Sequence, residues 1–293
     1  MSFVKSVDQV AGGGFVGADT VFKPAEVFQI LYETKPEAIK KLLPPPLKPQ
    51  EKPYVIVAHT NFMRVGFDVG LCGPGYLETA LYIPALNDGV KGTFVAGMTL
   101  NTDIGSFMGR ERVGFPKKAG NVGYYYKGNR YVAYSARHGI PYVILEGDMD
   151  GEPNDPQFLT EFNNAIVSDP AKPEFSYNFT YKWTPGIGGK LFQSQPLLIQ
   201  GLKSKTSLGI PKRIGKGKVH LIWSDDDPWA ELEVVRVLGA SLDVVESRIH
   251  AKGGKAIPVD PDVFAPYAFY GWDLMPHEEW QFSYQSMEKE VFI

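Results

Sequence analysis

Short apolar segments separated by turn-forming residues are the feature that most restricts how this chain can fold. The runs YVIVAHTNFM at residues 54–63 and GTFVAGMTLN at residues 92–101 each have the length and composition of a strand. The sequence GYYYKGNRYVAYSA at residues 123–136 is typical of a β-hairpin that turns at Gly128 and Asn129. With 31 glycines and 23 prolines to interrupt the chain, such segments indicate many short antiparallel strands.

Only a few segments have the periodicity of a helix. The segment AIKKLL, residues 38–43, follows a capping-box spacing of Thr34 and Glu37, and PQFLTEFNNAIV, residues 156–167, repeats apolar residues at helical intervals. The segment LEVVRVLGASLDVVESRI, residues 232–249, is compatible with a strand or a helix. We therefore predict a mainly β protein of the α+β kind, barrel-like or multi-sheet, with a few short helices.

The composition argues against several classes of partner and location. The net charge is −3, whereas a protein that binds nucleic acid usually presents a visibly basic face. No run of about 18 apolar residues is present to span a membrane, and the N-terminus lacks the continuous apolar stretch of a secretory signal. The only cysteine, Cys72, excludes an intrachain disulfide and fits a reducing compartment. We expect a cytoplasmic protein that binds neither nucleic acid nor a membrane.

Three motifs fall short of what a cofactor or metal site requires. The run GGGFVG at residues 12–17 lacks the preceding strand and the following helix of a dinucleotide site. The acidic turn SDDDP at residues 224–228 lacks the alternating oxygen ligands and the closing carboxylate of a calcium loop. The five histidines are never spaced as zinc ligands. We therefore expect no cofactor and no metal ion.

Two adjacent lysines, Lys117 and Lys118, stand in the motif GRERVGFPKKAG at residues 109–120. Composition alone favours a solvated turn. On an extended strand, however, neighbouring side chains point to opposite faces, so that one ammonium group could face an apolar pocket. Desolvation or a nearby cation would lower the pKa of such a lysine and make its amine nucleophilic.

The wider context of this motif resembles the acetoacetate decarboxylase superfamily. The matching segments, in order, are LYETKPEAIKKLLPPPL at 31–47, GYLETALYIPALNDGVKG at 75–92 and TFVAGMTLNTDIGSFMGRERVGFPKKAG at 93–120. Together with the turn-rich pattern, the resemblance implies an antiparallel, closed or cone-like β-barrel whose closure removes exposed strand edges.

The resemblance also implies roles for individual residues. Lys117 stands at the position of the family's Schiff-base lysine, and Lys118 at that of the neighbour that helps to lower its pKa. Glu78 stands at the position of the pocket glutamate and is the candidate proton carrier. Phe115 and Met98 are placed to line an apolar substrate pocket, although plain core packing explains them equally well.

One position departs from the pattern of the family's decarboxylases. Where their early motif reads Tyr-Arg-Thr, this chain reads Tyr32-Glu33-Thr34, which reverses the charge. A substrate-binding Glu33 would repel a carboxylate and would stabilise the ammonium form of Lys117. Either Glu33 is neutral, or another cation such as Arg64 compensates, or the substrate is not a small β-keto acid.

These observations together predict a Schiff-base-forming lyase that acts on a small-molecule keto substrate. Decarboxylation of a β-keto acid through a lysine imine is our first expectation. The alternatives are aldolase-dehydratase chemistry on pyruvate-like keto acids, a hydrolase or cyclase acting on a polyketide-like ketone, and a binding protein that has lost turnover.

The resemblance further implies a single domain over residues 1–293, with a loose N-terminal arm at 1–20 and an aromatic C-terminal extension at 264–293. We expect a homo-oligomer, in which the extension packs on the barrel or on a neighbouring subunit, because a free tail should not expose so many aromatic side chains. These are Phe264, Tyr267, Phe269, Tyr270, Trp272, Trp280, Phe282 and Tyr284.

Overall fold

Seven strands close into a barrel in the computed structural model, which describes residues 4, 6–8, 17–67 and 72–268. They are β1 (Thr20–Glu33), β3 (Tyr54–Phe67), β4 (Cys72–Asn87), β5 (Val90–Leu100), β10 (Phe175–Lys182), β11 (Leu197–Ser207) and β13 (Arg236–Ile249). The strand order is β11-β10-β5-β4-β3-β1-β13, and β13 pairs again with β11. Every pairing in this ring is antiparallel except that of β10 with β5. The predicted closed, mainly antiparallel barrel is confirmed.

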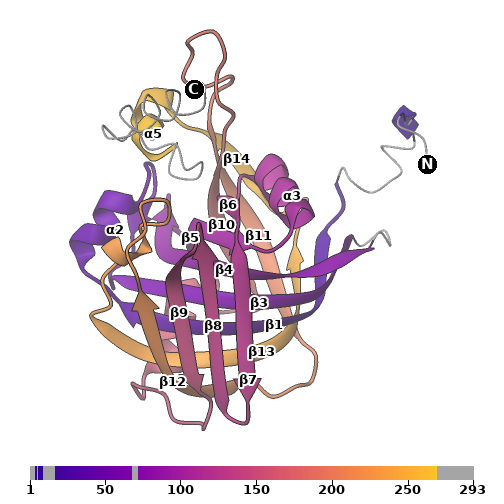
Figure 1. Ribbon diagram of the computed structural model, residues 1–293. Helices are drawn as coiled ribbons and strands as arrows, with labels where there is room; N and C mark the ends of the chain where they lie inside the picture. The colour runs from indigo at the N-terminus through magenta and orange to yellow at the C-terminus, as the bar shows by residue number, and fades with distance from the viewer. Residues whose placement is uncertain (1–3, 5, 9–16, 68–71, 269–293) are drawn as a thin grey trace, which may run out of the picture.

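A second sheet lies against the outside of the barrel. It contains β7 (Asn121–Lys127), β8 (Arg130–Arg137), β9 (Ile140–Asp148) and β12 (Arg213–Leu221), and its strands run across those of the barrel (Figure 1). Strand β12 belongs to both sheets, because its first three residues pair with β13 and the rest pair with β9. The predicted hairpin is formed by β7 and β8, which turn at Gly128 with φ at 61°.

The main core fills the space between the barrel and the second sheet. Phe28, Ile30 and Tyr32 of β1 belong to this core, and the ring of Phe28 lies 4.4 Å from that of Tyr131 on β8. The intervening residues of β1 are buried on the other face of the strand, where Val27 packs with residues such as Tyr76. Because both faces of β1 are covered, its sequence reads as a nearly continuous apolar run instead of an alternating one.

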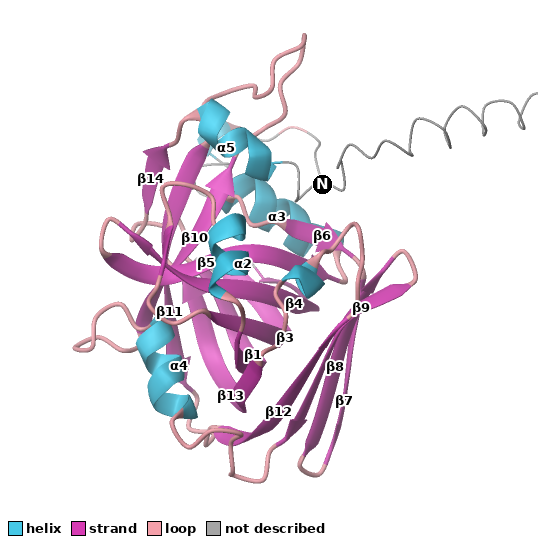
Figure 2. Ribbon diagram, turned by 90° about the vertical axis from the view of Figure 1, so that its left-hand side faces the viewer, coloured by secondary structure: helices cyan, strands magenta, loops and turns pink. Residues whose placement is uncertain are grey.

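The described residues contain four α-helices and one short 3-10 helix. Figure 2 shows the helices grouped around the barrel: α2 (Pro36–Leu42), α3 (Asp103–Val113), α4 (Phe158–Ile166) and α5 (Pro261–Ala268), with the 3-10 helix at Trp229–Glu231. The sequence predicted α2 and α4, although Thr34 makes no capping hydrogen bond and the N-cap is Lys35. It did not predict α3, whose interior carries two glycines that weaken the helical signal. The ambiguous segment at 232–249 forms mainly strand β13.

Three further strands are short: β2 (Lys48–Pro49), β6 (Lys117–Ala119) and β14 (Lys255–Pro258). Strand β6 holds the lysine pair and joins the open side of β5 in parallel. Strand β14 extends the barrel sheet beyond β11.

The ends of the described chain are attached to the barrel. Asp19 accepts a hydrogen bond from the backbone N–H of Ala251, immediately before β1 begins. At the other end, Phe264 of α5 is buried and stacks on Tyr181 with a centroid distance of 4.7 Å. The glycine run at 12–16, most of the predicted arm and the aromatic residues from Phe269 onward lie outside the described residues.

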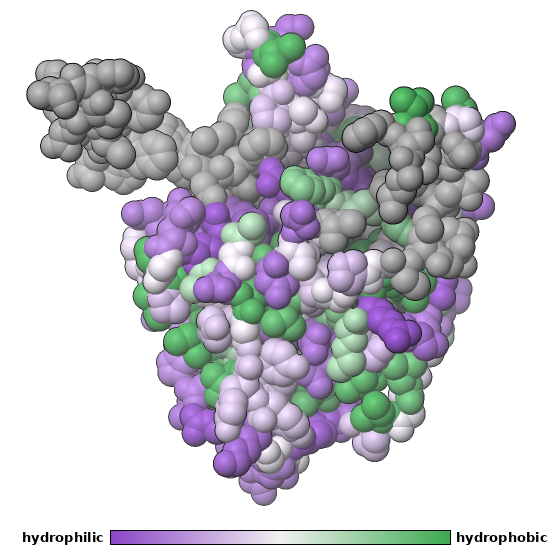
Figure 3. Space-filling model, turned by 45° about the vertical axis from the view of Figure 1, so that its right-hand side comes forward, coloured by the Kyte–Doolittle hydropathy of each residue, from purple (hydrophilic) through white to green (hydrophobic). Residues whose placement is uncertain are grey.

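The surface of the described part mixes residue types. On the face in Figure 3, hydrophobic residues are interspersed with hydrophilic ones. Among the described residues, no helix has the length and apolar character that crossing a bilayer would require. The homo-oligomer remains a prediction from the sequence.

Candidate active site

Strand β6 separates the two adjacent lysines. It follows α3 after a tight turn at Gly114, whose φ is 72°, and it pairs with β5 so that Lys117 lies opposite Met98 and Lys118 opposite Thr99. Because side chains alternate along a strand, Lys117 points into the barrel and Lys118 points away from it. The contacts of the two lysines, described next, agree with the predicted opposite orientation of their side chains.

Lys117 is held between two side chains of β4. Its side chain is only 6% exposed, and its Nζ lies 2.7 Å from Oε2 of Glu78. The same Nζ donates a hydrogen bond of 3.2 Å to the hydroxyl of Tyr76. Tyr76 and Glu78 are two residues apart on one strand, so they face the same way. The structure therefore brings two of the predicted site residues, Lys117 and Glu78, into direct contact.

The charge state of Lys117 differs from the sequence-based expectation. Burial acts to lower the pKa of Lys117, but the carboxylate of Glu78 and the hydroxyl of Tyr76 together outweigh it and raise that pKa above its ordinary value. Burial also raises the pKa of Tyr76 to about 12. The expected depressed pKa of Lys117 is therefore not found, because the carboxylate that was expected to move protons also forms an ion pair with the ammonium group.

Lys118 belongs to a separate buried ion cluster. Its Nζ lies 3.5 Å from Oδ1 of Asp227 and donates to the backbone carbonyl of Asp226. Oδ2 of Asp227 accepts a hydrogen bond of 2.9 Å from Arg137 on β8. The acidic turn at 224–228 thus neutralises buried cations. Within the described residues, no three potential ligands gather in a way that could hold a metal ion.

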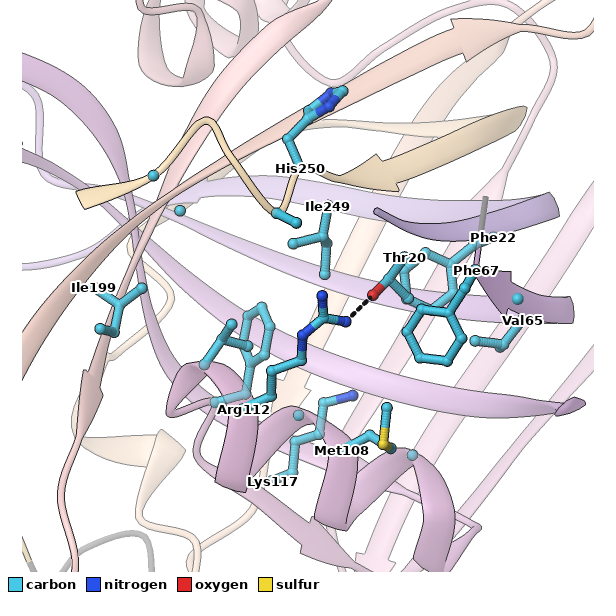
Figure 4. Close-up of a pocket in the computed structure, with 18 of the residues that line it drawn as sticks. Thr20, Phe22, Val65, Phe67, Met108, Arg112, Lys117, Ile199, Ile249 and His250 are labelled. Carbon is cyan, nitrogen blue, oxygen red and sulfur yellow. Dashed lines mark hydrogen bonds between the residues drawn. The ribbon is translucent and has the colours of Figure 1, made fainter. Parts of the chain in front are cut away.

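A large apolar cavity opens beside Lys117. Its volume is about 590 Å³, and in Figure 4 the side chain of Lys117 points into it. Arg112 of α3 crosses the cavity and donates a hydrogen bond of 2.9 Å to the hydroxyl of Thr20. The apolar lining includes Phe22, Val65, Phe67, Met108, Val113, Phe115, Ile199 and Ile249. We call this space the outer chamber.

A smaller cavity, of about 130 Å³, lies within the barrel on the other side of Lys117. We call it the inner chamber. Phe115 lines both chambers, whereas Met98 lines only the inner one, and both side chains are buried. The two residues therefore pack in the core and contact a cavity at the same time.

Glu33 is not brought to this site. It is the last residue of β1, and its carboxylate forms an ion pair of 3.0 Å with Arg236. Strand register aligns Val27, not Glu33, with Thr60 and thereby with Glu78. Six residues of strand at about 3.3 Å each separate Glu33 from that level. The expected electrostatic effect of Glu33 on substrate or on Lys117 therefore has no support in the structure.

Several site residues were not predicted from the sequence. Tyr76 precedes Glu78 by two positions, and this strand spacing was the available signal. Arg112 lies in the unpredicted helix α3. Gly109 of the same helix touches Lys117, since a Cβ atom added there would lie 2.7 Å from its Cδ and Cε. Arg110, by contrast, belongs to the motif that contains the two lysines, and it supports this segment by donating a hydrogen bond of 3.3 Å to the carbonyl of Lys117.

Comparison with known proteins agrees with this geometry. The family model described as acetoacetate decarboxylase matches residues 12–251, which include Tyr76, Glu78 and Lys117. The chain belongs to the acetoacetate decarboxylase family. The enzymes of this family include decarboxylases.

The relatives of this chain are named for different activities. The acetoacetate decarboxylase of Bordetella avium is 35% identical over 97 residues, which are 33% of this chain and 37% of that protein. The chain thus matches little more than a third of the length of the curated decarboxylase. A CLA biosynthesis isomerase of Lactiplantibacillus plantarum is 28% identical over 218 residues, which are 72% of this chain and 73% of that protein.

Solved structures show the same fold. An acetoacetate decarboxylase from Legionella pneumophila superposes with a TM-score of 0.67 at 18% identity, covering 89% of this chain and 98% of that one. The enduracididine biosynthesis enzyme MppR, in complex with pyruvate, superposes with a TM-score of 0.61 at 15% identity, covering 82% and 90%. At such identities the likeness establishes the barrel and its second sheet alone.

Gly109→Ala tests the contact between α3 and Lys117. The new Cβ would displace the lysine side chain from Glu78, while alanine favours the helix by up to about 1 kcal/mol. We expect the reaction of Lys117 with 2,4-pentanedione, which gives a UV-absorbing enaminone, to slow at least about tenfold at alkaline pH, where the amine is neutral in both proteins, and thermal stability to fall because the buried ion pair is weakened. Glu111→Ala, an exposed change on the same helix, should alter neither quantity. Normal reactivity of the Gly109→Ala protein would show that the contact is unimportant.

Asp227→Ala tests the buried cluster around Lys118. Removing this carboxylate leaves Lys118 and Arg137 buried without it, which costs about 3–5 kcal/mol. We expect the free energy of unfolding in urea to fall by that amount. Asp225→Ala is the matched control, because Asp225 is exposed and should change stability by no more than about 0.5 kcal/mol. Equal effects of the two substitutions would contradict the assignment.

Proposed function

We propose that this protein forms a Schiff base between Lys117 and a ketone that carries an apolar chain, and uses the resulting iminium ion to accept electrons. One observation carries the proposal: a buried amine lies 2.7 Å from a carboxylate at the edge of an apolar cavity of about 590 Å³. Such a cavity excludes water from the amine and offers space for a hydrocarbon chain. Acetoacetate itself would fill little of it.

The first step follows from the contact between Lys117 and Glu78. Transfer of one proton from the ammonium group to the carboxylate gives a neutral amine and a neutral acid, and in an apolar site this removes two buried charges. The amine attacks the carbonyl carbon, and a proton then moves from its nitrogen to the new alkoxide to give a carbinolamine. Protonation of the resulting hydroxyl by Glu78 then allows water to leave, and an iminium ion remains on Lys117.

Decarboxylation is the reaction we propose first. In a β-keto acid, the bond between the α-carbon and the carboxylate breaks, CO2 leaves, and its electron pair neutralises the iminium to give an enamine. Protonation at the α-carbon and addition of water then release the shortened ketone and the free lysine. Glu78 is the proposed proton carrier, and Tyr76, which contacts the same nitrogen, holds that nitrogen in place.

A double-bond shift is the second candidate, and the relative named as a CLA biosynthesis isomerase favours it. An iminium ion next to an alkene makes the neighbouring C–H groups acidic. Glu78 would remove a proton from one carbon, which gives a dienamine, and would return it to another carbon, so that no atom is gained or lost. The apolar outer chamber suits such a substrate as well as it suits a long-chain keto acid.

The remaining readings have weaker support. Aldol condensation and dehydration are suggested by MppR, whose structures include one with pyruvate and one with a condensation product of pyruvate, but pyruvate is too small and polar for the outer chamber. The outer chamber is large enough for a polyketide-like ketone, but no described residue specifically favours its hydrolysis or cyclisation. A binding protein without turnover would leave the Lys117–Glu78 pair without a role.

Borohydride trapping tests the nucleophile. Acetoacetate, a 3-oxo acid with a longer alkyl chain, pyruvate and an alkyl enone would each be incubated with the protein and reduced. We expect the intact mass to increase by that of the ketone, or of its decarboxylated product, less one oxygen atom, because the imine loses water and then gains two hydrogens on reduction; the increase should be most rapid with the two compounds that bear a chain. Release of CO2 would identify decarboxylation, and a change in conjugated-enone absorbance would identify isomerisation.

Two lysine variants make that experiment decisive. Lys117→Ala should abolish the adduct, whereas Lys190→Ala, which removes an exposed lysine from a surface loop, should leave it unchanged. An adduct that persists without Lys117, or no adduct with any ketone, would refute the proposal and leave the binding-protein reading.

The pH dependence of amine reactivity tests the role of Glu78. Because Glu78 helps to raise the pKa of Lys117, the reaction with 2,4-pentanedione should increase with pH up to strongly alkaline conditions in the natural protein. Glu78→Gln removes the negative charge, so the midpoint should move to lower pH by at least one unit, equivalent to about 1.4 kcal/mol. Glu111→Gln, at an exposed glutamate, should not move it. The same midpoint in all three proteins would contradict the assignment.

A further inference from the structure

The two chambers meet at Lys117. Phe22, Tyr76, Phe115, Lys117 and Ile249 line both of them, so the amine lies at their junction. A ketone bound to Lys117 therefore carries two substituents that can occupy two different environments.

The inner chamber is much more polar than the outer one. Side chains from several barrel strands line it with hydrogen-bonding groups, among them Gln29, Thr60, Thr93, Asn178 and Ser247. Glu78 also faces it, but this carboxylate is already engaged with Lys117. The chamber therefore suits a small polar group and not a hydrocarbon chain.

Two further lysines line the inner chamber. Lys203 and Lys205 are two residues apart on β11 and so point to the same face of the strand. Lys203 Nζ lies 5.2 Å from the centre of the Tyr82 ring. Within the described residues, neither of these ammonium groups has a hydrogen bond or a carboxylate partner. Lys117 and Lys118, in contrast, each have a carboxylate partner.

The other charged groups near the chamber do not compensate for these two cations. Lys117 and Glu78 neutralise each other, and Lys212 pairs with Asp243 at 3.1 Å. Glu174 lines the chamber from an exposed position. Burial, and then the charge of Lys205, lower the pKa of Lys203 to about 7. Burial and the charge of Lys212 lower the pKa of Lys205 to about 8, although Asp243 acts in the opposite direction.

We propose that the inner chamber is a carboxylate subsite and that Lys203 is its anion-binding residue. An unpaired cation at a half-buried position is costly, and a bound carboxylate offsets that cost with a charge-assisted hydrogen bond. The volume of about 130 Å³ admits a carboxylate with one or two carbon atoms. Among the described residues, no carboxylate forms an ion pair with Lys203.

This subsite defines a substrate class, a deduction that rests on the proposed imine at Lys117. The ketone carbon would be bound at the junction, the carboxylate in the inner chamber and an apolar chain in the outer chamber. A 3-oxo acid with an alkyl chain at C4 has this arrangement, since its carboxyl carbon is two bonds from the ketone carbon. Lys203 would then be a specificity-determining residue that selects keto acids over neutral ketones.

The subsite can be tested without imine chemistry by using ligands that contain no ketone. Calorimetric binding of hexanoate would be compared with that of 1-hexanol, which has the same chain without the charge. We expect the natural protein to prefer hexanoate at least about tenfold near pH 6. Lys203→Met should remove the preference, and Lys190→Met, on the surface loop, should preserve it. A preference that survives in Lys203→Met would overturn the proposal.

The pH dependence provides a second readout that does not require loss of the lysine. In the natural protein the preference should fall between about pH 6 and about pH 9, as Lys203 loses its proton. Lys203→Arg should keep the preference over that whole range, because a guanidinium group stays protonated. The same decline in Lys203→Arg would assign the titration to another group and refute the role of Lys203.

Lys117→Ala separates this inference from the proposed function. Because that variant leaves Glu78 without its cation, the double variant Lys117→Ala/Glu78→Gln is used as well, and hexanoate should still be preferred there, since no imine is involved. If borohydride trapping fails with every ketone while the preference depends on Lys203, the imine proposal is wrong and the carboxylate subsite stands. If trapping succeeds and the preference for hexanoate does not depend on Lys203, the carboxylate subsite is wrong and the imine proposal stands.

Discussion

The pairing of the three-residue strand β6 with β5 determines the rest of the site. It places two adjacent ammonium groups on opposite faces of one sheet, and the fold supplies a separate carboxylate for each. Glu78 comes from the neighbouring strand of the barrel, and Asp227 comes from a turn that covers its outer side. Without this division, two buried cations would share one environment, which is strongly unfavourable in a medium of low polarity.

The second sheet has a direct part in this division. Because β7, β8, β9 and β12 cover the outside of the barrel, the face that receives Lys118 is as well buried as the interior that receives Lys117. Arg137 of β8 completes the ion cluster on that side. The barrel interior is thereby left for chemistry, with an apolar chamber and a polar chamber meeting at one amine.

Sequence periodicity predicted the features that depend on local pattern. The hairpin at Gly128, helices α2 and α4 and the opposite orientation of the lysines all follow from strand or helix spacing. Long-range pairing was not accessible in this way. The ion pair of Glu33 with Arg236 joins residues about two hundred positions apart, and the placement of Lys203 beside the site requires barrel closure. Both results depend on register between distant strands, which no local signal encodes.

Because the two lysines are adjacent, the loss of one residue and the gain of one residue before them have different consequences for the site. A strand that slips by one residue turns every side chain to the other face. Loss of one residue from the connection between Gly114 and Lys117 would move Lys118 opposite Glu78, so that an amine would still face the barrel interior. Gain of one residue would instead turn Lys117 toward Asp227 and leave Glu78 without an amine beside it. A one-residue deletion in this connection should therefore preserve the site far more readily than a one-residue insertion.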